Sequence, residues 1–309
     1  MRLAFVFSGQ GSQYLNMAID LLDAYPSIEQ EANLLLGYDV RHLLSHESLL
    51  HQTEYTQPLI FLHQALVLEH LKTLNLLPEA VLGFSLGEYT AYYSAGVLSF
   101  SSAIKLIQKR AMAMQQCSMA HPGKMAAVIG GSVDLIEEVI RSIKTEKILR
   151  IANYNSPNQH VISGDEKSFY EAIKQLKEHG IKRIIELQVS GAFHTELMEE
   201  AGRKIESYAQ TLAPKTPQVP IWLNATARPW NHQDFPNIIK TQTVSPVLFE
   251  PSIRAMISEG FTHFLEIGPK KVLSGLIQKI DETALVCNMD TLKDIDQVKG
   301  WLNTYVNQR

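Results

Sequence analysis

Apolar residues occur along this chain in two patterns, short continuous runs and longer stretches with a spacing of three and four. Short runs of buried-strand type stand at 3–7, 80–82 and 262–267. Helical spacing fills 28–77, with Pro58 in the first turn of its last long helix, and further helices are expected near 14–22 and, with an amphipathic pattern, at 272–280. A strand is expected at 220–224, followed by a loop that contains Gln242. Continuous apolar strands separated by helices are typical of a parallel sheet covered on both faces. The pattern therefore predicts an α/β fold.

The middle of the chain, 123–190, follows another order. Its expected elements are a strand at 125–129, a helix at 134–143, strands at 150–153 and 159–163, a helix at 166–179 and a strand at 183–189. This βαββαβ order is that of the ferredoxin-like motif. We therefore expect an inserted ferredoxin-like subdomain at 123–190, a discontinuous larger domain at 1–122 and 191–309, and a ligand cleft between them.

A candidate nucleophile stands directly after the apolar run 80–82. Gly83-x-Ser85-x-Gly87 is followed by a predicted helix, and strand–turn–helix is the context of a nucleophile elbow. Glycines on both sides suit a turn too tight for a side chain, and the serine at its tip lies near free helix N–H groups. The pentapeptide also describes an ordinary Gly/Ser turn, but its flanking elements favour the nucleophile.

A second glycine-containing loop, Gly9-Gln10-Gly11, follows the first predicted strand. It lacks the third glycine of a dinucleotide fingerprint and the Lys-Ser/Thr of a P-loop, so a nucleotide site is not expected. Ligands gather at the carboxyl ends of parallel strands. Either the Gln10 side-chain amide or the N–H groups of the loop could therefore face a polarised carbonyl beside Ser85.

Two further side chains have suggestive positions. Arg110 falls at the edge of the apolar stripe of the helix expected at 103–116. It either meets an anion or is a snorkelling or ion-paired structural residue. His194 stands among small residues where the chain leaves the insertion, and it is either structural or catalytic.

Composition and charge narrow the function classes. The net charge of −4, without a run of Lys and Arg, argues against a nucleic-acid binder. Cys117 and Cys287 show no C-x-x-C spacing and are interpreted as reduced thiols of a cytoplasmic protein. No signal peptide and no bilayer-spanning segment is expected. His42 and His46, spaced i and i+4, are interpreted as surface residues and not as metal ligands.

Several short motifs, each present once, are spread in order over nearly the whole chain. They are Gly9-Gln10-Gly11-Ser12-Gln13, Thr56-Gln57-Pro58, Gly83-Phe84-Ser85-Leu86-Gly87-Glu88, Arg110 in a Lys-Arg-x-x-x-Met-Gln setting, Asn155-Ser156-Pro157-x-Gln159-x-Val161-Ile162-Ser163-Gly164, Gly191-Ala192-Phe193-His194, and Glu266-Ile267-Gly268-Pro269. Together they resemble the malonyl-CoA:acyl carrier protein transacylases and their polyketide acyltransferase relatives. The resemblance implies a hydrolase-like parallel-sheet core with a ferredoxin-like insertion.

The resemblance also implies roles at the reacting centre. Ser85 would be the nucleophile and His194 its general base, while Gln10 and the backbone N–H of Leu86 would form the oxyanion hole. A thioester is already activated, so a neutral acceptor in place of an acidic triad member could still fix the imidazole tautomer.

Three further residues are expected to act on the substrate or on the histidine. Arg110 would bind the free carboxylate of the malonyl group through its planar guanidinium. Gln242 would steady the histidine through a carbonyl, and Phe193 would crowd a branched acyl group.

The implied activity is transfer of malonyl from malonyl-CoA, through a Ser85 ester, to the phosphopantetheine thiol of an acyl carrier protein in fatty-acid or polyketide synthesis. The alternatives are an acyl hydrolase on the same site and a non-catalytic docking module for carrier proteins. No metal or cofactor beyond the coenzyme A substrate is expected, and the family implies a monomer.

This sequence departs from the family pattern at three places. Phe84 stands where a histidine usually precedes the serine, and Ser8 replaces a usual proline. Lys270-Lys271 brings lysine to a point where glycine is usual. Phe84 adjoins the nucleophile and could alter the choice of acyl group.

Overall fold

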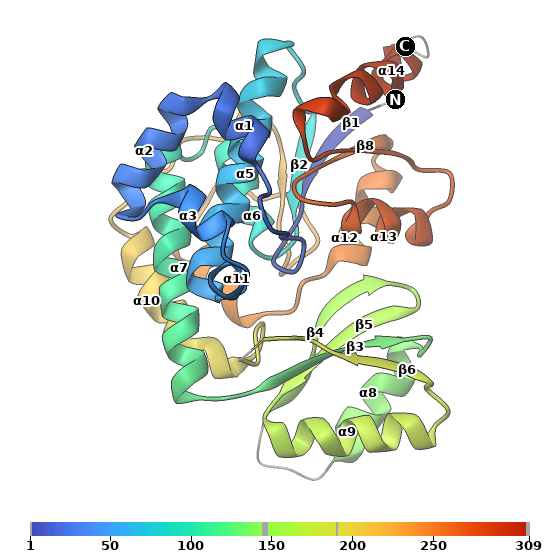
Figure 1. The fold of residues 1–309 in the computed structure, drawn as a ribbon. Coiled ribbons are helices and arrows are strands. Elements are labelled where there is room, and N and C mark those ends of the chain that lie inside the picture. Colours follow the sequence, from blue (N-terminus) through green and yellow to red (C-terminus); the bar gives the residue numbers. More distant parts are fainter. Residues whose placement is uncertain (1, 144–147, 190, 307–309) are drawn as a thin grey trace.

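The computed structural model describes residues 2–143, 148–189 and 191–306. Figure 1 shows two parts, a larger α/β body that contains both ends of the chain and a smaller part built on a second sheet. No helix in these described ranges combines the length and hydrophobicity that crossing a bilayer requires.

The larger body is organised on a five-stranded sheet with the order β7-β2-β1-β8-β9, in which every neighbouring pair is parallel. Its strands are β1 (Arg2–Phe7), β2 (Ala80–Gly83), β7 (Ile221–Trp222), β8 (Phe261–Ile267) and β9 (Leu285–Met289). Because parallel strands need long crossovers, helices cover both faces of this sheet.

Strand β1 shows how the sequence divides the core. Its alternate side chains point to opposite faces, so that Leu3, Phe5 and Phe7 join one buried cluster while Ala4 and Val6 join another. The second cluster is completed by α12 (Phe249–Ser258) and α13 (Val272–Ile280).

The first cluster is larger and is filled by the remaining helices of the body. These are α1 (Ile19–Ala24), α2 (Pro26–Leu36), α3 (Val40–Leu44), α4 (Glu47–Leu50), α5 (Thr53–Thr73), α6 (Gly87–Ser94), α7 (Phe100–Ala120), α10 (Glu199–Ala209), α11 (Phe235–Val244) and α14 (Ile295–Val306). Two short 3₁₀ turns, η1 (Glu196–Met198) and η2 (Leu292–Asp294), precede α10 and α14.

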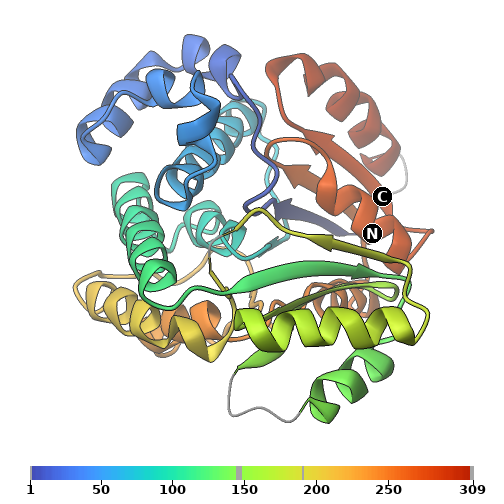
Figure 2. The same ribbon diagram turned by 60° about the horizontal axis from the view of Figure 1, so that its bottom comes forward.

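The smaller part is an antiparallel sheet with the order β4-β5-β3-β6. Its elements are β3 (Lys124–Ile129), α8 (Val133–Ser142), β4 (Leu149–Ser156), β5 (Gln159–Gly164), α9 (Glu166–Glu178) and β6 (Arg183–Glu186). The predicted βαββαβ order is confirmed. Helices α8 and α9 pack on one face of the sheet with a core of their own, and the other face is turned toward the larger body (Figures 1 and 2).

The predicted domain limits fall where the two crossing segments meet. Pro122 and Gly191 form an isolated antiparallel bridge there, and a second bridge joins Asn153 to Val247 of the larger body. Ser190, like the chain ends 1 and 309, lies outside the described residues. We propose the division at 122/123 and 190/191, which these contacts support.

Several expected elements differ in detail. The helix expected from residue 14 begins only at Ile19, because Asn16 and Ala18 have left-handed backbones, with φ of 61° and 67°. Pro58 lies inside α5 and not in its first turn, since this helix already begins at Thr53. Gln242 was expected in a loop but lies in α11.

Other differences concern strand ends and the last part of the chain. The strand expected at 220–224 is reduced to β7, because the chain turns after Trp222 to pair with Pro229. The sequence interpretation stopped at Ile280 and missed β9 and α14. Strand β9 lies at the sheet edge and is half-exposed, so that it lacks a continuous apolar run.

Substitution of Gly83 by alanine should lower the free energy of unfolding by about 3 kcal/mol. A Cβ at Gly83 would lie 1.8 Å from the backbone carbon of Gly87, so the turn after β2 would have to open. Urea unfolding followed by circular dichroism measures the change. Gly275→Ala is the matched control, because its Cβ would meet no atom within 4 Å and should stabilise α13. Equal stability of the two variants would contradict this packing argument.

Candidate active site

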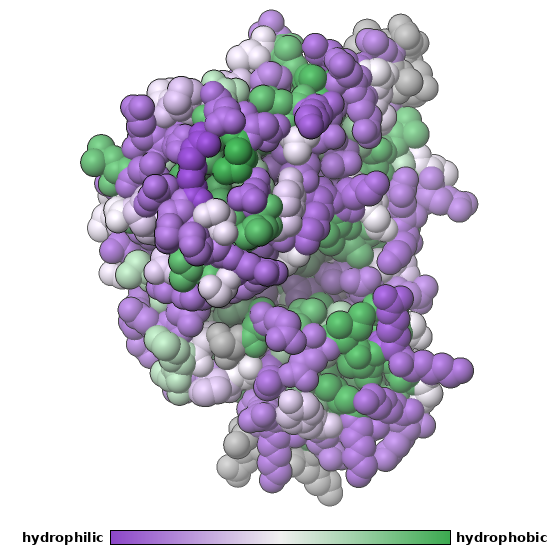
Figure 3. All heavy atoms as spheres, in the orientation of Figure 1, coloured by the Kyte–Doolittle hydropathy of each residue, from purple (hydrophilic) through white to green (hydrophobic). Residues whose placement is uncertain are grey.

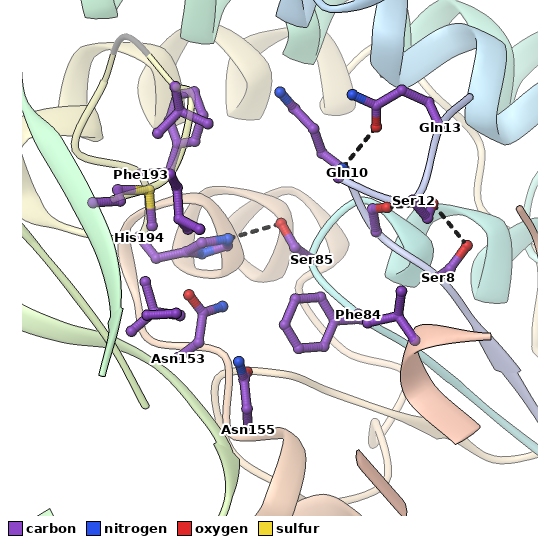
Figure 4. A pocket seen from close by; sticks show the side chains of 18 of the residues that line it. Ser8, Gln10, Ser12, Gln13, Phe84, Ser85, Asn153, Asn155, Phe193 and His194 are labelled. Carbon is purple, nitrogen blue, oxygen red and sulfur yellow. Dashed lines mark hydrogen bonds between the residues drawn. The ribbon is translucent and has the colours of Figure 1, made fainter. Parts of the chain in front are cut away.

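The carboxyl ends of β1, β2 and β8 lie at one edge of the large sheet, and the loops that follow them line a pocket of about 420 Å³. The small part supplies the opposite wall through β3, β4 and β5. Figure 3 shows the surface hollowed between the two parts, and Figure 4 shows the side chains at the bottom of the hollow. The site therefore lies in the cleft expected from the sequence.

Ser85 occupies a strained turn that side chains from elsewhere hold in place. Its φ is 52°, in the left-handed region. The Asn224 side chain accepts a hydrogen bond from the Ser85 N–H at 2.7 Å and donates one to the Gly83 carbonyl at 2.6 Å. This amide spans the turn and fixes the backbone on both sides of Phe84.

Asn224 is itself held by a buried carboxylate. Glu88, fully buried in α6, accepts hydrogen bonds from the Asn224 N–H at 2.6 Å and from the Tyr92 hydroxyl at 2.8 Å. Burial raises the pKa of Glu88 to about 7, although both hydrogen bonds and the charge of Arg110 favour the ionised form. The Ser85 turn is thus attached to the core through a polar network.

Ser85 and His194 lie together although 109 positions separate them in the sequence. Ser85 Oγ is 2.7 Å from His194 Nε2, and the two side chains point toward each other (Figure 4). His194 Nδ1 lies 3.0 Å from the Ser245 carbonyl and 3.2 Å from the Gln242 carbonyl. These two acceptors place the proton of a neutral imidazole on Nδ1 and leave Nε2 free to take the serine proton.

The environment keeps His194 neutral. Burial, and then the nearby charge of Arg110, lower its pKa to about 4, against the opposing effect of the two carbonyl acceptors. At neutral pH the imidazole is therefore a base that does not first have to lose a proton.

Arg110 is a buried cation whose recorded partners are all neutral. It is 1 % exposed. Its Nη1 donates to Gln57 Oε1 at 2.6 Å, and its Nη2 lies 3.2 Å from Ser85 Oγ and 3.4 Å from Gln242 Oε1. Nε has no hydrogen-bond partner, and the guanidinium forms no salt bridge with any carboxylate of the described chain.

These contacts bear on the two interpretations of Arg110 left open by the sequence. A side chain so deeply buried does not snorkel, and no carboxylate of the described residues forms a salt bridge with it. Burial has the larger effect and lowers the pKa of Arg110, and the charge of Glu88 acts on Arg110 without such a contact. A buried cation in this setting, beside the Ser85 hydroxyl, is suited to an anionic ligand.

The sequence offered either the Gln10 side-chain amide or backbone N–H groups as donors near Ser85. The Gln10 side chain donates to Thr53 Oγ1 at 3.1 Å and extends away from the Ser85 hydroxyl (Figure 4). The backbone N–H groups of Gln10 and Leu86 have no acceptor within the described ranges. The two backbone N–H groups are therefore donors without a partner in the described ranges, whereas the Gln10 side-chain amide is already engaged.

Residues 4–293 match the family model of the acyl transferase domain. The chain belongs to this family. It is 37% identical over 308 residues to a malonyl CoA-acyl carrier protein transacylase of Staphylococcus aureus strain MW2, covering 97% of this chain and 98% of the relative.

Solved structures agree with this assignment. The crystal structure of MCAT from Streptococcus pneumoniae has a TM-score of 0.91 and 37% identity, with 96% of this chain and 99% of that chain covered. A holo type II PKS acyl-carrier protein in complex with its malonyl-transacylase has a TM-score of 0.91 at 31% identity, covering 96% and 98%. The predicted family and α/β fold class are confirmed.

The site of this acyltransferase contains residues that sequence reasoning missed. Asn224 and Glu88 hold the turn, Gln57 contacts the guanidinium, and Ser245 supplies the nearer acceptor for His194. Gln57 and Glu88 stood in the recognised motifs without a role. For Ser245 the sequence offered no signal, since a backbone carbonyl has no side-chain signature, and the side chain of Asn224 stood outside every recognised motif.

The remaining wall of the acyltransferase pocket is partly polar. Asn153 and Asn155 of β4 are each 5 % exposed and line the pocket, and the buried Asn155 Oδ1 accepts no hydrogen bond from any residue that the structure describes. Phe84 lies against Phe249, with ring centroids 5.4 Å apart, and Phe193 lines the pocket beside the histidine.

The structure also bears on the metal interpretation of the two spaced histidines. The rings of His42 and His46 lie 4.1 Å apart at exposed positions. Within the described residues, no group of three or more histidine, cysteine, aspartate or glutamate side chains is arranged to hold a metal ion.

The rate at which an uncharged serine reagent labels Ser85 should depend on pH through His194. Since the pKa of His194 is lowered to about 4, its neutral form persists as the pH falls, and labelling should decline only with a midpoint near that value. Arg110→Met removes a nearby positive charge and should move the midpoint upward. Mass spectrometry of the labelled protein follows both rates, with circular dichroism to verify folding at each pH. A midpoint at the ordinary histidine value of about 6.5 in the unsubstituted protein would contradict the burial argument.

Proposed function

We propose that this acyltransferase transfers the malonyl group of malonyl-CoA to the phosphopantetheine thiol of an acyl carrier protein. The observation that carries the proposal is the buried Arg110 guanidinium, which lies 3.2 Å from the Ser85 hydroxyl and forms no salt bridge with a carboxylate in the described part of the chain. A malonyl thioester brings a free carboxylate on the short acyl group that Ser85 would attack. The names of the relatives support the same substrate and acceptor.

Ser85 and His194 would carry out the chemistry in two symmetrical steps. Ser85 Oγ attacks the thioester carbonyl while His194 Nε2 takes its proton, and the C–S bond breaks to leave a malonyl-serine ester. The imidazolium returns the proton to the departing coenzyme A sulfur. The carrier thiol then attacks the ester, loses its proton to His194 and releases Ser85 with its hydrogen.

Two groups would stabilise the charge that develops in each step. The backbone N–H groups of Gln10 and Leu86 would donate to the oxyanion, and the Ser245 and Gln242 carbonyls would hold the imidazolium through Nδ1–H. Gln242 also donates from Nε2 to the Ser85 carbonyl at 2.7 Å, so it fixes both partners of the proton transfer.

Arg110 would select the acyl group. Gln57 and Gln242 hold the guanidinium from two sides, so that its plane can receive a carboxylate in bidentate fashion. Each charge-assisted hydrogen bond is worth about 1.5–3 kcal/mol. Phe193, beside His194, would limit room for a branch on the acyl chain and so favour malonyl over methylmalonyl groups.

The hydrolase alternative uses the same serine and histidine but would admit water to the ester. Its distinguishing feature would be loss of the arginine, and Arg110 is retained with an ordered set of partners. A docking module without activity would not require a serine–histidine contact of 2.7 Å. Neither alternative has a specific observation in its favour.

Finer features also belong to this proposal. The free thiols of Cys117 and Cys287 support a reducing, cytoplasmic location. We propose a monomer that needs neither metal nor bound cofactor and that binds neither nucleic acid nor membrane. The carrier could serve fatty-acid or polyketide synthesis, and parallel transfer assays with both kinds of carrier protein decide between them.

Incubation with malonyl-CoA should add one malonyl group to the intact protein, because Ser85 forms an ester that persists until an acceptor thiol arrives. Intact-protein mass spectrometry detects the adduct, and Ser85→Ala should abolish it. Addition of holo-carrier protein should discharge the adduct onto the carrier. Coenzyme A release into water without transfer would instead identify a hydrolase, and absence of any adduct would identify a docking module.

Arg110→Ala should reduce malonyl transfer about 10²-fold or more relative to acetyl transfer, because two charge-assisted hydrogen bonds are lost at 1.4 kcal/mol per decade. The ratio of kcat/KM for malonyl-CoA and acetyl-CoA measures this selectivity. Lys109→Ala removes the neighbouring, exposed cation of the same helix and should leave the ratio unchanged. An unchanged ratio in Arg110→Ala would refute the carboxylate-binding role.

A further inference from the structure

Lys270 lies at the rim of the active-site pocket, in the loop between β8 and α13. Its side chain is exposed and is one of the pocket's lining residues, and exposed Lys271 follows it. It stands opposite the wall formed by the small part of the protein. A cation is thus present at the entrance, apart from the buried Arg110.

The backbone of Lys270 has a conformation in which glycine is the usual residue. Its φ is 63°, and the loop is fixed there because the Lys270 N–H donates to Asp290 Oδ2 at 2.9 Å. A left-handed backbone is unfavourable for a residue with a Cβ. Folding alone therefore does not account for a lysine here, and strained positions with a side chain are often functional.

The Lys270 ammonium group retains most of its binding capacity. Nζ donates to the Gln13 carbonyl at 3.2 Å, and in the described part of the protein it forms no salt bridge. The nearby Asp290 is already engaged with His63, Tyr14 and the Lys270 backbone. An ammonium has three donors, so two remain for a ligand at the rim.

We propose that Lys270 binds the 4′-phosphate of the phosphopantetheine arm that coenzyme A and acyl carrier protein share. The inference rests on the proposed function. Between the thioester and this phosphate the arm is uncharged, so the phosphate is the first anionic group that both partners present beyond the malonyl carboxylate.

The charge balance of the protein gives this cation a further purpose. The chain has a net charge of −4, and its substrates are anionic, so long-range repulsion opposes their approach. Lysines at the rim offset that repulsion locally. The uncharged part of the arm would pass the opposite wall, where Asn155 Oδ1 offers an acceptor for an amide N–H.

The test compares malonyl-4′-phosphopantetheine with malonyl-pantetheine, which differ only in this phosphate. Lys270→Met removes the ammonium and keeps most of the stem, and the ratio of the two kcat/KM values should fall about fivefold, or about 1 kcal/mol at 1.4 kcal/mol per decade. Lys270→Arg should largely restore the ratio. Lys279→Ala, an exposed lysine at the other end of α13, should leave it as in the unsubstituted protein.

Lys270→Gly provides a second variant that also removes the strain. Its melting temperature should equal or exceed that of the unsubstituted protein, and its ratio should fall as in Lys270→Met. The second half-reaction can be tested in the same way, with phosphopantetheine and pantetheine as thiols that discharge the malonyl-enzyme. The ratio of these two discharge rates should fall by the same factor in the variant, because donor and acceptor share the phosphate.

Three outcomes would overturn the assignment. The ratio of the two kcat/KM values could stay unchanged, either with no loss or with an equal loss for both thioesters. Lys270 would then not bind the phosphate, and any loss would come from its contact with the Gln13 loop. Malonyl-CoA is assayed beside the two shorter thioesters. If Lys270→Met lowers kcat/KM for malonyl-CoA alone, the ammonium binds the phosphates on the adenosine side and not the 4′-phosphate. If the unsubstituted protein forms a malonyl ester with neither thioester, the proposed function itself fails, and the assignment with it.

Discussion

Ser85 keeps a left-handed backbone at the end of β2, which costs an L-residue about 1–2 kcal/mol. The surrounding structure stabilises this conformation, because Asn224 binds the backbone on both sides of the turn and Glu88 holds Asn224. The glycines at 83 and 87 let the turn pack against α6 and β1 without a Cβ. Every other group of the site is placed relative to this turn. The strained backbone at Ser85 is thus stabilised by contacts from several parts of the fold.

The buried charge of Arg110 is the second determinant of the site. Its hydrogen-bond partners Gln57, Gln242 and Ser85 are neutral, so among the described residues this buried cation has no carboxylate in direct contact. The same charge helps to lower the pKa of His194, which keeps the imidazole neutral. In the proposed function, one guanidinium would therefore link the binding of a carboxylate to the protonation state of His194. An incoming carboxylate would relieve part of the burial cost.

The pocket has two different walls because it lies between the two sheets of the protein. The large body contributes Ser85, Arg110 and the loop N–H groups, and the small part adds a wall with Asn153 and Asn155 on one strand face. His194 follows directly after the crossing back into the large body, and its position depends on both segments. The deep end of the pocket carries a buried cation and the rim an exposed one. This arrangement matches a ligand with an anionic acyl end and a longer arm.

The sequence alone determined the α/β class, the βαββαβ insertion and the serine turn, because these depend on periodicity and on glycines at fixed spacing. It also supplied the motifs that place the chain in its family. It did not determine the partners of Arg110, the turning away of the Gln10 side chain, or the support from Asn224, Glu88 and Ser245. Edge strand β9 was not predicted, because its residues are half-exposed and form no continuous apolar run. Local sequence patterns predict which residues are buried in a helix or strand. Contacts between segments more than a hundred positions apart, such as Ser85 with His194, exist only once the chain is folded.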